Sequence, residues 1–198
     1  MKVSVLMKTY NHERFIKQAI ESALMQTTDF PYKIVIGEDC STDGTRNIVV
    51  EYQKKYPDKI VLLLYDENVG MRRNYIRLLQ LCSGEYIAEL EGDDFWTSPH
   101  KLQKQVDFLD AHPDFAICFH PVRMFHEGTD EEWEIFPQGV KEVSVLEDLF
   151  EYNFIPTCSV MYRSGRIREF PGWFHELKMG DWTVHLLNAR HGKIQFLD

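Results

Sequence analysis

Apolar and polar positions follow two different periods along the first half of the chain. Apolar residues spaced three and four apart predict helices over 13–25 and 71–82, and two more that begin near Asp43 and at Ser98. Ser98 is the expected N-cap of its helix, with Pro99 in the first turn. The alternation predicts a mostly parallel sheet with right-handed crossovers and helices on both faces. The predicted strands are short apolar runs over 3–7, 33–36, 60–64 and 86–90.

The second half of the chain is less regular. Strands are expected over 115–119, 157–162 and 193–197, and helices over 145–152 and 181–191. These segments predict an α/β domain that adds mixed strands and loops in its later part. A length of 198 residues suits one domain, because a chain of that size buries a substantial core.

Composition narrows the class of protein. Hydrophobic residues make up 44% of the chain and charged residues 27%, as in ordinary globular proteins, and no apolar run approaches the ~20 residues of a membrane-spanning helix. The run at 3–7 is too short for a signal peptide, so a cytoplasmic location is expected. The net charge of −9 argues against nucleic acid as a partner. The acidic run at 130–134 is expected in a solvated hairpin or loop. Four cysteines without a close pair are expected as reduced thiols: Cys40, Cys82, Cys118 and Cys158.

Polar side chains gather after each of the first four predicted strands. Residues 9–11 follow the first strand, 38–45 the second, 67–70 the third and 91–94 the fourth. The carboxyl ends of parallel strands share one edge of the sheet, and open α/β folds bind their ligands there. Four such clusters in succession therefore predict a single cleft.

The segment Glu91-Gly92-Asp93-Asp94 is the most suggestive chemically. In an extended segment Glu91 and Asp93 point to the same side, and Gly92 lets a ligand approach the backbone. One or two carboxylates together with phosphate oxygens are typical of Mg²⁺ or Mn²⁺ sites in proteins. The alternative is a solvated acidic turn in which Asp93 or Asp94 caps a neighbouring group.

Glu38 and Asp39 end the second predicted strand. A carboxylate at Asp39 can accept a hydrogen bond from the imide N–H of uracil, whereas the alternative is an acidic strand end followed by a helix cap at Ser41 or Asp43. Tyr10 could stack on a base or lie in the core. These residues therefore place a possible base-binding site beside the acidic segment.

Five segments together resemble family 2 glycosyltransferases. The resemblance is carried by residues 3–11, 19–27, 34–45, 68–74 and 84–102, in order and spacing. It implies a GT-A fold and transfer of a sugar from a nucleotide donor with inversion at the anomeric carbon. It also implies one domain over 1–198, with a nucleotide-sugar-binding half at 1–112 and an acceptor-side half at 113–198.

The resemblance assigns roles to the polar clusters. Asp39 would contact the base, Thr9 and Tyr10 would line the nucleoside pocket, and Asp93 would be the direct metal ligand, with Glu91 near the ribose or a metal-bound water. Arg73 is either a contact to the donor phosphates or an arginine on the helix surface. The expected donor-binding residues are Thr9, Tyr10, Asn11, Glu38, Asp39, Asn68, Gly70, Arg73, Glu91 and Gly92.

Asp181 is the expected catalytic base, because it stands where the family has the aspartate that deprotonates the acceptor. Its alternative role is to cap the helix that begins there. Trp182 is expected in the core or the cleft wall, and His185 and His191 as structural or surface residues. The chain departs from the family pattern at three positions, which hold Lys8, Glu91 and Gly180.

The resemblance implies an enzyme that uses a divalent cation, Mn²⁺ or Mg²⁺, and a nucleotide-sugar donor, with UDP as the favoured nucleotide. The acceptor would be a glycan or lipid-linked sugar in cell-surface polysaccharide synthesis, in the cytoplasm or at the inner face of the membrane. Relatives usually continue with further helices after the position of Asp198, so a C-terminal truncation is expected. The competing hypotheses are an inactive nucleotide-sugar-binding module and, with less support, a glycoside hydrolase that uses Glu91 and Asp181.

Overall fold

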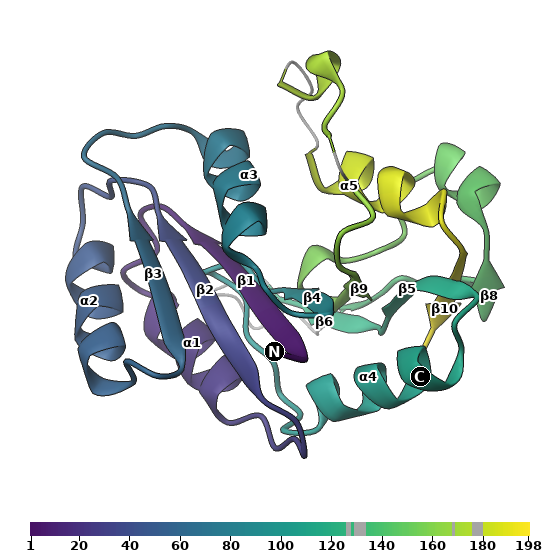
Figure 1. Ribbon diagram of the computed structural model, residues 1–198, viewed down its shortest axis with the longest axis horizontal. Coiled ribbons are helices and arrows are strands. Elements are labelled where there is room, and N and C mark those ends of the chain that lie inside the picture. Colours follow the sequence, from purple (N-terminus) through teal and green to yellow (C-terminus); the bar gives the residue numbers. More distant parts are fainter. Residues whose placement is uncertain (126–127, 129–133, 168, 176–179) are drawn as a thin grey trace.

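The computed structural model describes the chain except for residues 126–127, 129–133, 168 and 176–179. Strands and helices alternate through the first half, as the apolar pattern predicts, and strands of mixed direction follow (Figure 1). The first half contains β1 (Val3–Thr9), α1 (Ile16–Leu24), β2 (Tyr32–Glu38), α2 (Thr45–Lys55), β3 (Ile60–Leu64), α3 (Met71–Leu81), β4 (Tyr86–Glu89) and α4 (Lys101–Ala111). The second half contains β5 (Phe115–Phe119), β6 (Val122–Met124), β7 (Glu134–Phe136), β8 (Val143–Ser144), β9 (Met161–Arg163), α5 (Gly180–Ala189) and β10 (Lys193–Phe196), with 3₁₀ helices at Leu146–Phe150, Thr157–Ser159 and Gly172–His175.

Eight strands form one sheet in the order β3-β2-β1-β4-β9-β5-β10-β8. The β3, β2, β1 and β4 strands are parallel, and β9 runs antiparallel between β4 and β5. The register pairs Thr9 with Glu38 and Glu38 with Leu64, so three strands end at the same level. The parallel sheet and the common edge predicted for the polar clusters are therefore confirmed.

Each face of the sheet is covered by its own set of helices. Alternate residues of β1 point to opposite faces, so Val5 packs with apolar residues of α1, α2 and α4, whereas Leu6 packs with those of α3 and α5. Figure 1 shows α3 and α5 on the same side of the sheet. Since α3 comes from the first half of the chain and α5 from the second, this face brings the two halves of the predicted site together.

The structure corrects three local predictions. Helix α4 begins at Lys101, so Ser98 is not its N-cap, although Ser98 Oγ accepts the N–H of His100 just before the helix at 3.3 Å. The side chain of Gln26 accepts the N–H of Leu102 at 3.1 Å. This long-range hydrogen bond satisfies one of the N–H donors of the first turn, which have no partner within the helix. The expected helix over 145–152 is a 3₁₀ helix, and the expected strand over 157–162 begins with a 3₁₀ turn before β9.

The structure also bears on the cysteines, the acidic run and the expected absence of a membrane-spanning helix. The four cysteines are free thiols. In the acidic run, residues 130–133 lie outside the described part of the chain, and the exposed Glu134 lies in β7, which pairs with β6 as a hairpin strand. Among the described residues, no helix combines the length and apolar character needed to cross a membrane.

Candidate active site

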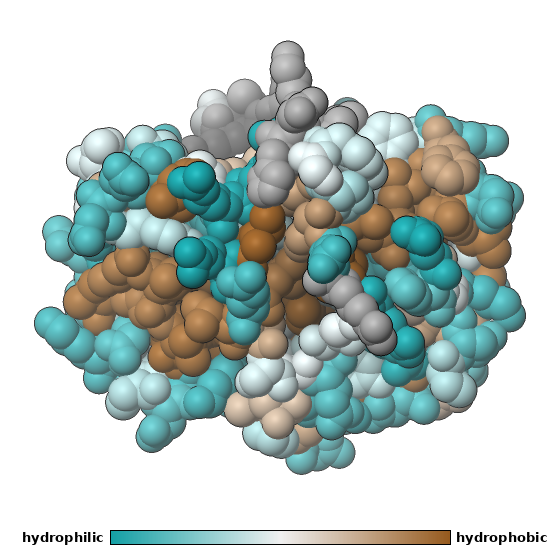
Figure 2. All heavy atoms as spheres, turned by 45° about the horizontal axis from the view of Figure 1, so that its top comes forward, coloured by the Kyte–Doolittle hydropathy of each residue, from teal (hydrophilic) through white to brown (hydrophobic). Residues whose placement is uncertain are grey.

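Two adjoining cavities open beside the carboxyl ends of β1, β2 and β4. The first, here the Asp39 cavity, has a volume of about 360 Å³, and the second, the Asp181 cavity, has about 220 Å³. Lys8, Met71 and Glu91 line both. In Figure 2 this side of the molecule is hollowed at its centre, with apolar surface at depth and hydrophilic side chains around it. The Asp39 cavity is also lined by Thr9, Tyr10, His12, Asp39, Asn68, Gly70, Asn74 and Asp93, and the Asp181 cavity by Arg72, Tyr75, Glu89, Thr157, Phe174, Gly180, Asp181 and Val184.

Asp39 lines the first cavity and fixes the 68–70 loop beside it through hydrogen bonds. Its buried carboxylate accepts the backbone N–H groups of Val69 at 2.7 Å and Gly70 at 2.9 Å. The Asn68 side chain donates to the Asp39 carbonyl at 3.0 Å, and Gly70 has a φ of 85°, which favours glycine. Asp39 therefore shapes the 68–70 loop and also lines the cavity.

The end of β1 supplies the next wall. Thr9 is buried, and its hydroxyl has no hydrogen-bond partner in the described part of the chain. Tyr10 is 42% exposed at the cavity, which rules out its alternative place in the core. This wall therefore contains a buried hydroxyl without a partner among the described residues and an exposed aromatic ring.

Two of the expected donor-binding residues bind the protein itself rather than line a cavity. Asn11 accepts the N–H of Thr42 at 2.8 Å and so ties the end of β1 to the 41–45 loop. Glu38 is fully buried and accepts hydrogen bonds from Ser41 N–H and the Arg46 guanidinium. Both residues therefore support the loop behind the Asp39 cavity.

The three carboxylates of the acidic segment 91–94 have different surroundings. Glu91 forms an ion pair with Lys8 at 3.1 Å, which offsets its charge. Burial, with Glu91 and Asp93 nearby, raises the pKa of Asp94 to about 6. The side chain of Asp93 is 52% exposed, with His12 Nε2 at 3.7 Å from its Oδ2. Asp93 is thus the most open carboxylate of the segment.

Gly92 lies where a side chain would meet atoms of the neighbouring residues. A Cβ at this position would lie 2.6 Å from Thr9 Oγ1 and 2.7 Å from His12 Nδ1. The Thr9 and His12 side chains therefore lie close to the Gly92 backbone. The close approach seats the acidic segment against the end of β1.

The donor set around Asp93 fits a divalent cation that the substrate helps to bind. Among the described residues, no three His, Cys, Asp or Glu side chains cluster in a way that could hold a metal ion by themselves. Mg²⁺ and Mn²⁺ sites at phosphates need only one or two carboxylates, because phosphate oxygens and water complete the shell. The half-exposed carboxylate of Asp93 beside a polar cavity meets that requirement.

Asp181 lies in the first turn of α5 and lines the second cavity. Its Oδ2 accepts hydrogen bonds from Asn153 Nδ2 at 3.1 Å and from Thr157 Oγ1 at 3.5 Å. These two side chains orient the carboxylate. The neighbouring Trp182 donates to the Leu149 carbonyl at 2.8 Å, so its indole anchors α5 to the 3₁₀ helix before it.

Charged and polar groups that the sequence did not single out complete the site. Lys8 lies between both cavities; burial opposes its charge, but attraction from Glu91 and Glu89 outweighs burial and raises the pKa of Lys8. Glu89 is buried and accepts the hydroxyls of Tyr75 at 2.7 Å and Tyr162 at 2.9 Å. Burial raises the pKa of Glu89. Only the departure from the family pattern at Lys8 signalled this cluster in the sequence.

Arg72 and Arg73 are neighbours on α3 and differ in the cavities that they line. Arg73 is exposed and lines neither cavity, whereas its neighbour Arg72 lines the Asp181 cavity. Asn74 lines the Asp39 cavity and donates to the Gly37 carbonyl at 2.9 Å. Consecutive residues on α3 point in different directions, which is why the choice between Arg72 and Arg73 depends on the helix packing.

Parallel strands with a polar cleft at their carboxyl ends define an α/β protein of the kind that binds ligands at this edge of the sheet. The sequence model of Glycosyl transferase family 2 matches residues 4–168, and the chain belongs to that family. An uncharacterized protein of Mycobacterium tuberculosis, Rv1520, is 37% identical over 195 residues, which cover 98% of this chain and 56% of that protein. The putative glycosyltransferase EpsE of Bacillus subtilis is 32% identical over 87% of this chain and 60% of its own length.

Solved structures show the same fold. The crystal structure of Staphylococcus aureus TarS 1-349 in complex with UDP-GlcNAc matches with a TM-score of 0.74 and 25% identity, over 100% of this chain and 56% of that one. The expected GT-A fold is therefore confirmed. The chain spans a little over half the length of these similar proteins.

Proposed function

We propose that this chain is the catalytic core of an inverting glycosyltransferase that moves a sugar from a nucleotide donor to an acceptor hydroxyl. The observation that carries the proposal is the arrangement of two adjoining cavities, with Asp39 and Asp93 in one and Asp181 in the other. Such a pair can hold a donor and an acceptor on opposite sides of one reacting carbon. Holding both substrates in this way supplies much of the rate of a two-substrate reaction.

The donor would lie in the Asp39 cavity. Asp39 would accept the imide N–H of the base, the exposed ring of Tyr10 would stack on it, and the unpaired Thr9 hydroxyl would bind the nucleoside. Asp93 would hold a divalent cation, Mn²⁺ or Mg²⁺, which when bound neutralises charge on the departing diphosphate. Lys8 balances Glu91 at the junction of the cavities, so less negative charge opposes the approach of the diphosphate.

Asp181 would act as the general base. Asn153 and Thr157 hold its Oδ2, and its carboxylate takes the proton of the acceptor hydroxyl as that oxygen bonds to the anomeric carbon. The bond between the anomeric carbon and the phosphate oxygen breaks on the opposite face, and the nucleoside diphosphate leaves. The product has inverted configuration, since attack and departure occur on opposite faces.

The similar proteins support UDP as the nucleotide and a glycan as the acceptor, with a lipid-linked sugar as our alternative acceptor. TarS is described in complex with UDP-GlcNAc, and a further relative, TuaG of Bacillus subtilis, is named a putative teichuronic acid biosynthesis glycosyltransferase. TuaG is 36% identical over 107 residues, 54% of this chain. We place the reaction in cell-surface polysaccharide synthesis on the cytoplasmic side of the membrane.

Calorimetric titration with UDP tests the donor site. Wild-type protein is expected to bind UDP in the presence of Mn²⁺ and to lose most of that affinity in excess chelator. Asp93→Ala should behave with Mn²⁺ as the wild type does with chelator, whereas Asp58→Ala, in an exposed loop before β3, should match the wild type. UDP binding that ignores both the metal and Asp93 would contradict the proposal.

A nucleotide-sugar-binding module without transferase activity is the second candidate. The departures from the family pattern at Glu91 and Gly180 favour it, because they stand beside the proposed metal ligand Asp93 and the proposed base Asp181. Metal-dependent UDP binding without turnover of any nucleotide sugar would support the binding module over the enzyme.

A further inference from the structure

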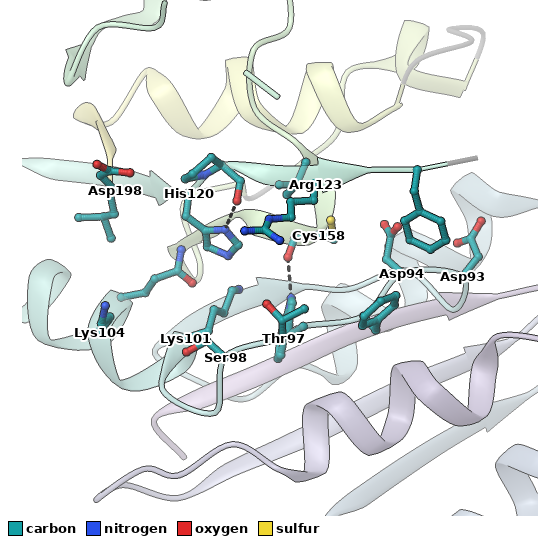
Figure 3. A pocket seen from close by; sticks show the side chains of 17 residues that line it. Asp93, Asp94, Thr97, Ser98, Lys101, Lys104, His120, Arg123, Cys158 and Asp198 are labelled. Carbon is teal, nitrogen blue, oxygen red and sulfur yellow. Dashed lines mark hydrogen bonds between the residues drawn. The ribbon is translucent and has the colours of Figure 1, made fainter. Parts of the chain in front are cut away.

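A third cavity of about 340 Å³ lies between the 93–98 loop, the first turn of α4 and the connection from β5 to β6. This size is at the lower end of the range for small-molecule sites. It shares Asp93 with the Asp39 cavity and no residue with the Asp181 cavity. Figure 3 shows Asp93 and Asp94 at one end and Lys101, Lys104, His120 and Asp198 toward the other.

Lys101 is the unusual residue of this cavity, which we call the Lys101 cavity. Its side chain is buried, with 5% of the residue exposed, and Nζ has no hydrogen-bond partner in the described part of the chain. Nζ lies 4.2 Å from the centre of the Trp96 ring, a contact that offsets only part of the loss of water. Burial lowers the pKa of Lys101 to about 7. A buried ammonium without a hydrogen-bonded partner is costly, so an anion in the cavity would be strongly favoured.

His120, which also lines this cavity, supplies a second buried polar atom without a partner among the described residues. Its Nδ1 lies 2.9 Å from the Pro121 carbonyl, and its Nε2 is buried without a partner among the described residues. Burial, with Lys101 nearby, lowers the pKa of His120 to about 4, so the ring is neutral at neutral pH. Since Nδ1 then carries the proton that binds the carbonyl, Nε2 is an acceptor for a ligand hydroxyl.

The rest of the lining suits a ligand with an anionic group and a sugar or alkyl body. Phe95, Trp96 and Phe125 supply aromatic walls. The exposed Lys104 and Arg123 add positive charge at the rim of the cavity. At the end of the cavity that holds Lys101 and Lys104, Asp198 is the one carboxylate among the lining residues. The opposite end opens at Asp93, beside the proposed donor site.

We propose that the Lys101 cavity binds a phosphate group of the acceptor. Lys101 Nζ would donate a hydrogen bond to a phosphate oxygen, and His120 Nε2 would accept a hydrogen bond from a hydroxyl group of the acceptor. The acceptor would extend from this cavity past Asp93 toward Asp181. This inference rests on the proposed function for the identity of the ligand as an acceptor. Its chemistry, a phosphate beside a hydroxyl-bearing or alkyl group, rests on the cavity itself.

Calorimetry with small phosphates in excess chelator tests this site. The probes are glucose 6-phosphate and hexyl phosphate at about pH 7, with glucose and hexanol as their neutral counterparts. Wild-type protein is expected to bind a phosphate in preference to its neutral counterpart. Lys101→Met should weaken phosphate binding about tenfold or more, which corresponds to about 1.4 kcal/mol. Lys104→Met, which removes an exposed charge at the rim, should change it by less than about threefold.

A second variant separates the two contacts. His120→Phe keeps an aromatic ring and removes the acceptor, so it should weaken glucose 6-phosphate more than hexyl phosphate. Tighter binding of hexyl phosphate would indicate a lipid-linked acceptor, and tighter binding of glucose 6-phosphate would indicate a water-soluble or polymeric one. Equal phosphate affinity in the wild type and Lys101→Met, or no phosphate binding by the wild type, would overturn the assignment.

The outcome is separable from that of the proposed function. UDP binding with Mn²⁺, measured on wild-type protein, tests the donor site alone. If UDP fails to bind while glucose 6-phosphate binds through Lys101, the transferase proposal falls and the phosphate site stands. If UDP binds and neither phosphate probe does, the donor site stands and the Lys101 cavity is not a phosphate site.

Discussion

At the scale of single residues, the carboxylates of the candidate site differ in the groups that surround them. Glu91 is paired with Lys8, Glu89 is buried under two tyrosine hydroxyls, and Asp181 accepts hydrogen bonds from neutral side chains. Asp93 remains half-exposed. Four carboxylates with four different surroundings can therefore take different roles, as perturbed groups in active sites commonly do.

Asp181→Asn tests the role of the base. The amide cannot take a proton from the acceptor, so transfer should fall by about 10²–10⁴-fold, the usual contribution of a general base. UDP binding should stay unchanged, because Asp181 lines a different cavity from Asp39. The measurement is the rate of product formation at saturating donor, with Asp58→Asn as the control. A variant that transfers at the wild-type rate would exclude Asp181 as the base.

Lys101 predicts an unusual dependence of stability on pH. Burial lowers its pKa from 10.5 to about 7, so between these values the folded state has lost a proton that the unfolded state keeps. The free energy of unfolding should therefore rise with pH in this window, by about 1.4 kcal/mol for each pH unit, and below pH 7 the full cost of the buried charge remains.

Urea unfolding of wild type and Lys101→Met between about pH 7 and pH 9 measures this contribution. The difference in unfolding free energy between the two proteins should change by about 1.4 kcal/mol per pH unit, with the variant more stable at the lower pH. A constant difference across the window would show that the Lys101 pKa is not lowered.

At the scale of elements, α3 packs on β2 through a close contact between Asn74 and Gly37, which leaves no room for a side chain at position 37. Asn74 donates to the Gly37 carbonyl, and a Cβ on Gly37 would lie 2.0 Å from Asn74 Oδ1 and 2.9 Å from Leu78 Cδ1. Both Met71 and Asn74 of α3 line the Asp39 cavity. The spacing between this helix and the sheet therefore sets the width of the proposed donor site.

Gly37→Ala should push α3 away from the sheet. We expect a loss of about 1–3 kcal/mol in the free energy of unfolding, as for other insertions into packed regions, together with weaker UDP binding. Gly172→Ala is the matched control, because a Cβ at Gly172 meets no atom within 4 Å. Thermal unfolding and calorimetry measure the two effects. Equal stability of the two variants would show that the Asn74 contact yields without cost.

At the scale of the whole molecule, residues from both halves of the chain meet at one sheet edge. Asp39 and Asp93 come from loops after β2 and β4, whereas Asp181 comes from α5, which follows β9 in the chain. The antiparallel β9 lies between β4 and β5 in the sheet and so joins the two halves. A ligand at this edge contacts loops far apart in sequence and should stabilise the fold as a unit.

UDP with Mn²⁺ should accordingly raise the unfolding temperature. At a concentration of about 100 times Kd the stabilisation is about 2.7 kcal/mol, or roughly 5–10 °C for a chain of this length. Excess chelator or the Asp93→Ala substitution should remove most of the increase, since the diphosphate then loses its metal. A shift of equal size in Asp93→Ala would argue against a metal at this residue.

The sequence by itself determined the order of the elements, the parallel part of the sheet and the edge at which the polar clusters meet. Those features follow from local periodicity: apolar runs specify buried strands, and the polar clusters after them meet because parallel strands end together. Asp39 and Asp93 belong to the polar clusters at this edge, whereas Asp181 follows no parallel strand and is chosen from the family resemblance alone.

Only the tertiary structure decided which polar groups face each other. It turned Asn11 and Glu38 toward the 41–45 loop, placed Thr9 and His12 against Gly92, and put Gln26 on the first turn of α4. It also joined Lys8 to Glu91 and left Lys101 buried without a hydrogen-bond partner in the described part of the chain. These contacts join residues far apart in sequence, and their geometry follows from how helices and loops pack on the sheet, which no local pattern encodes.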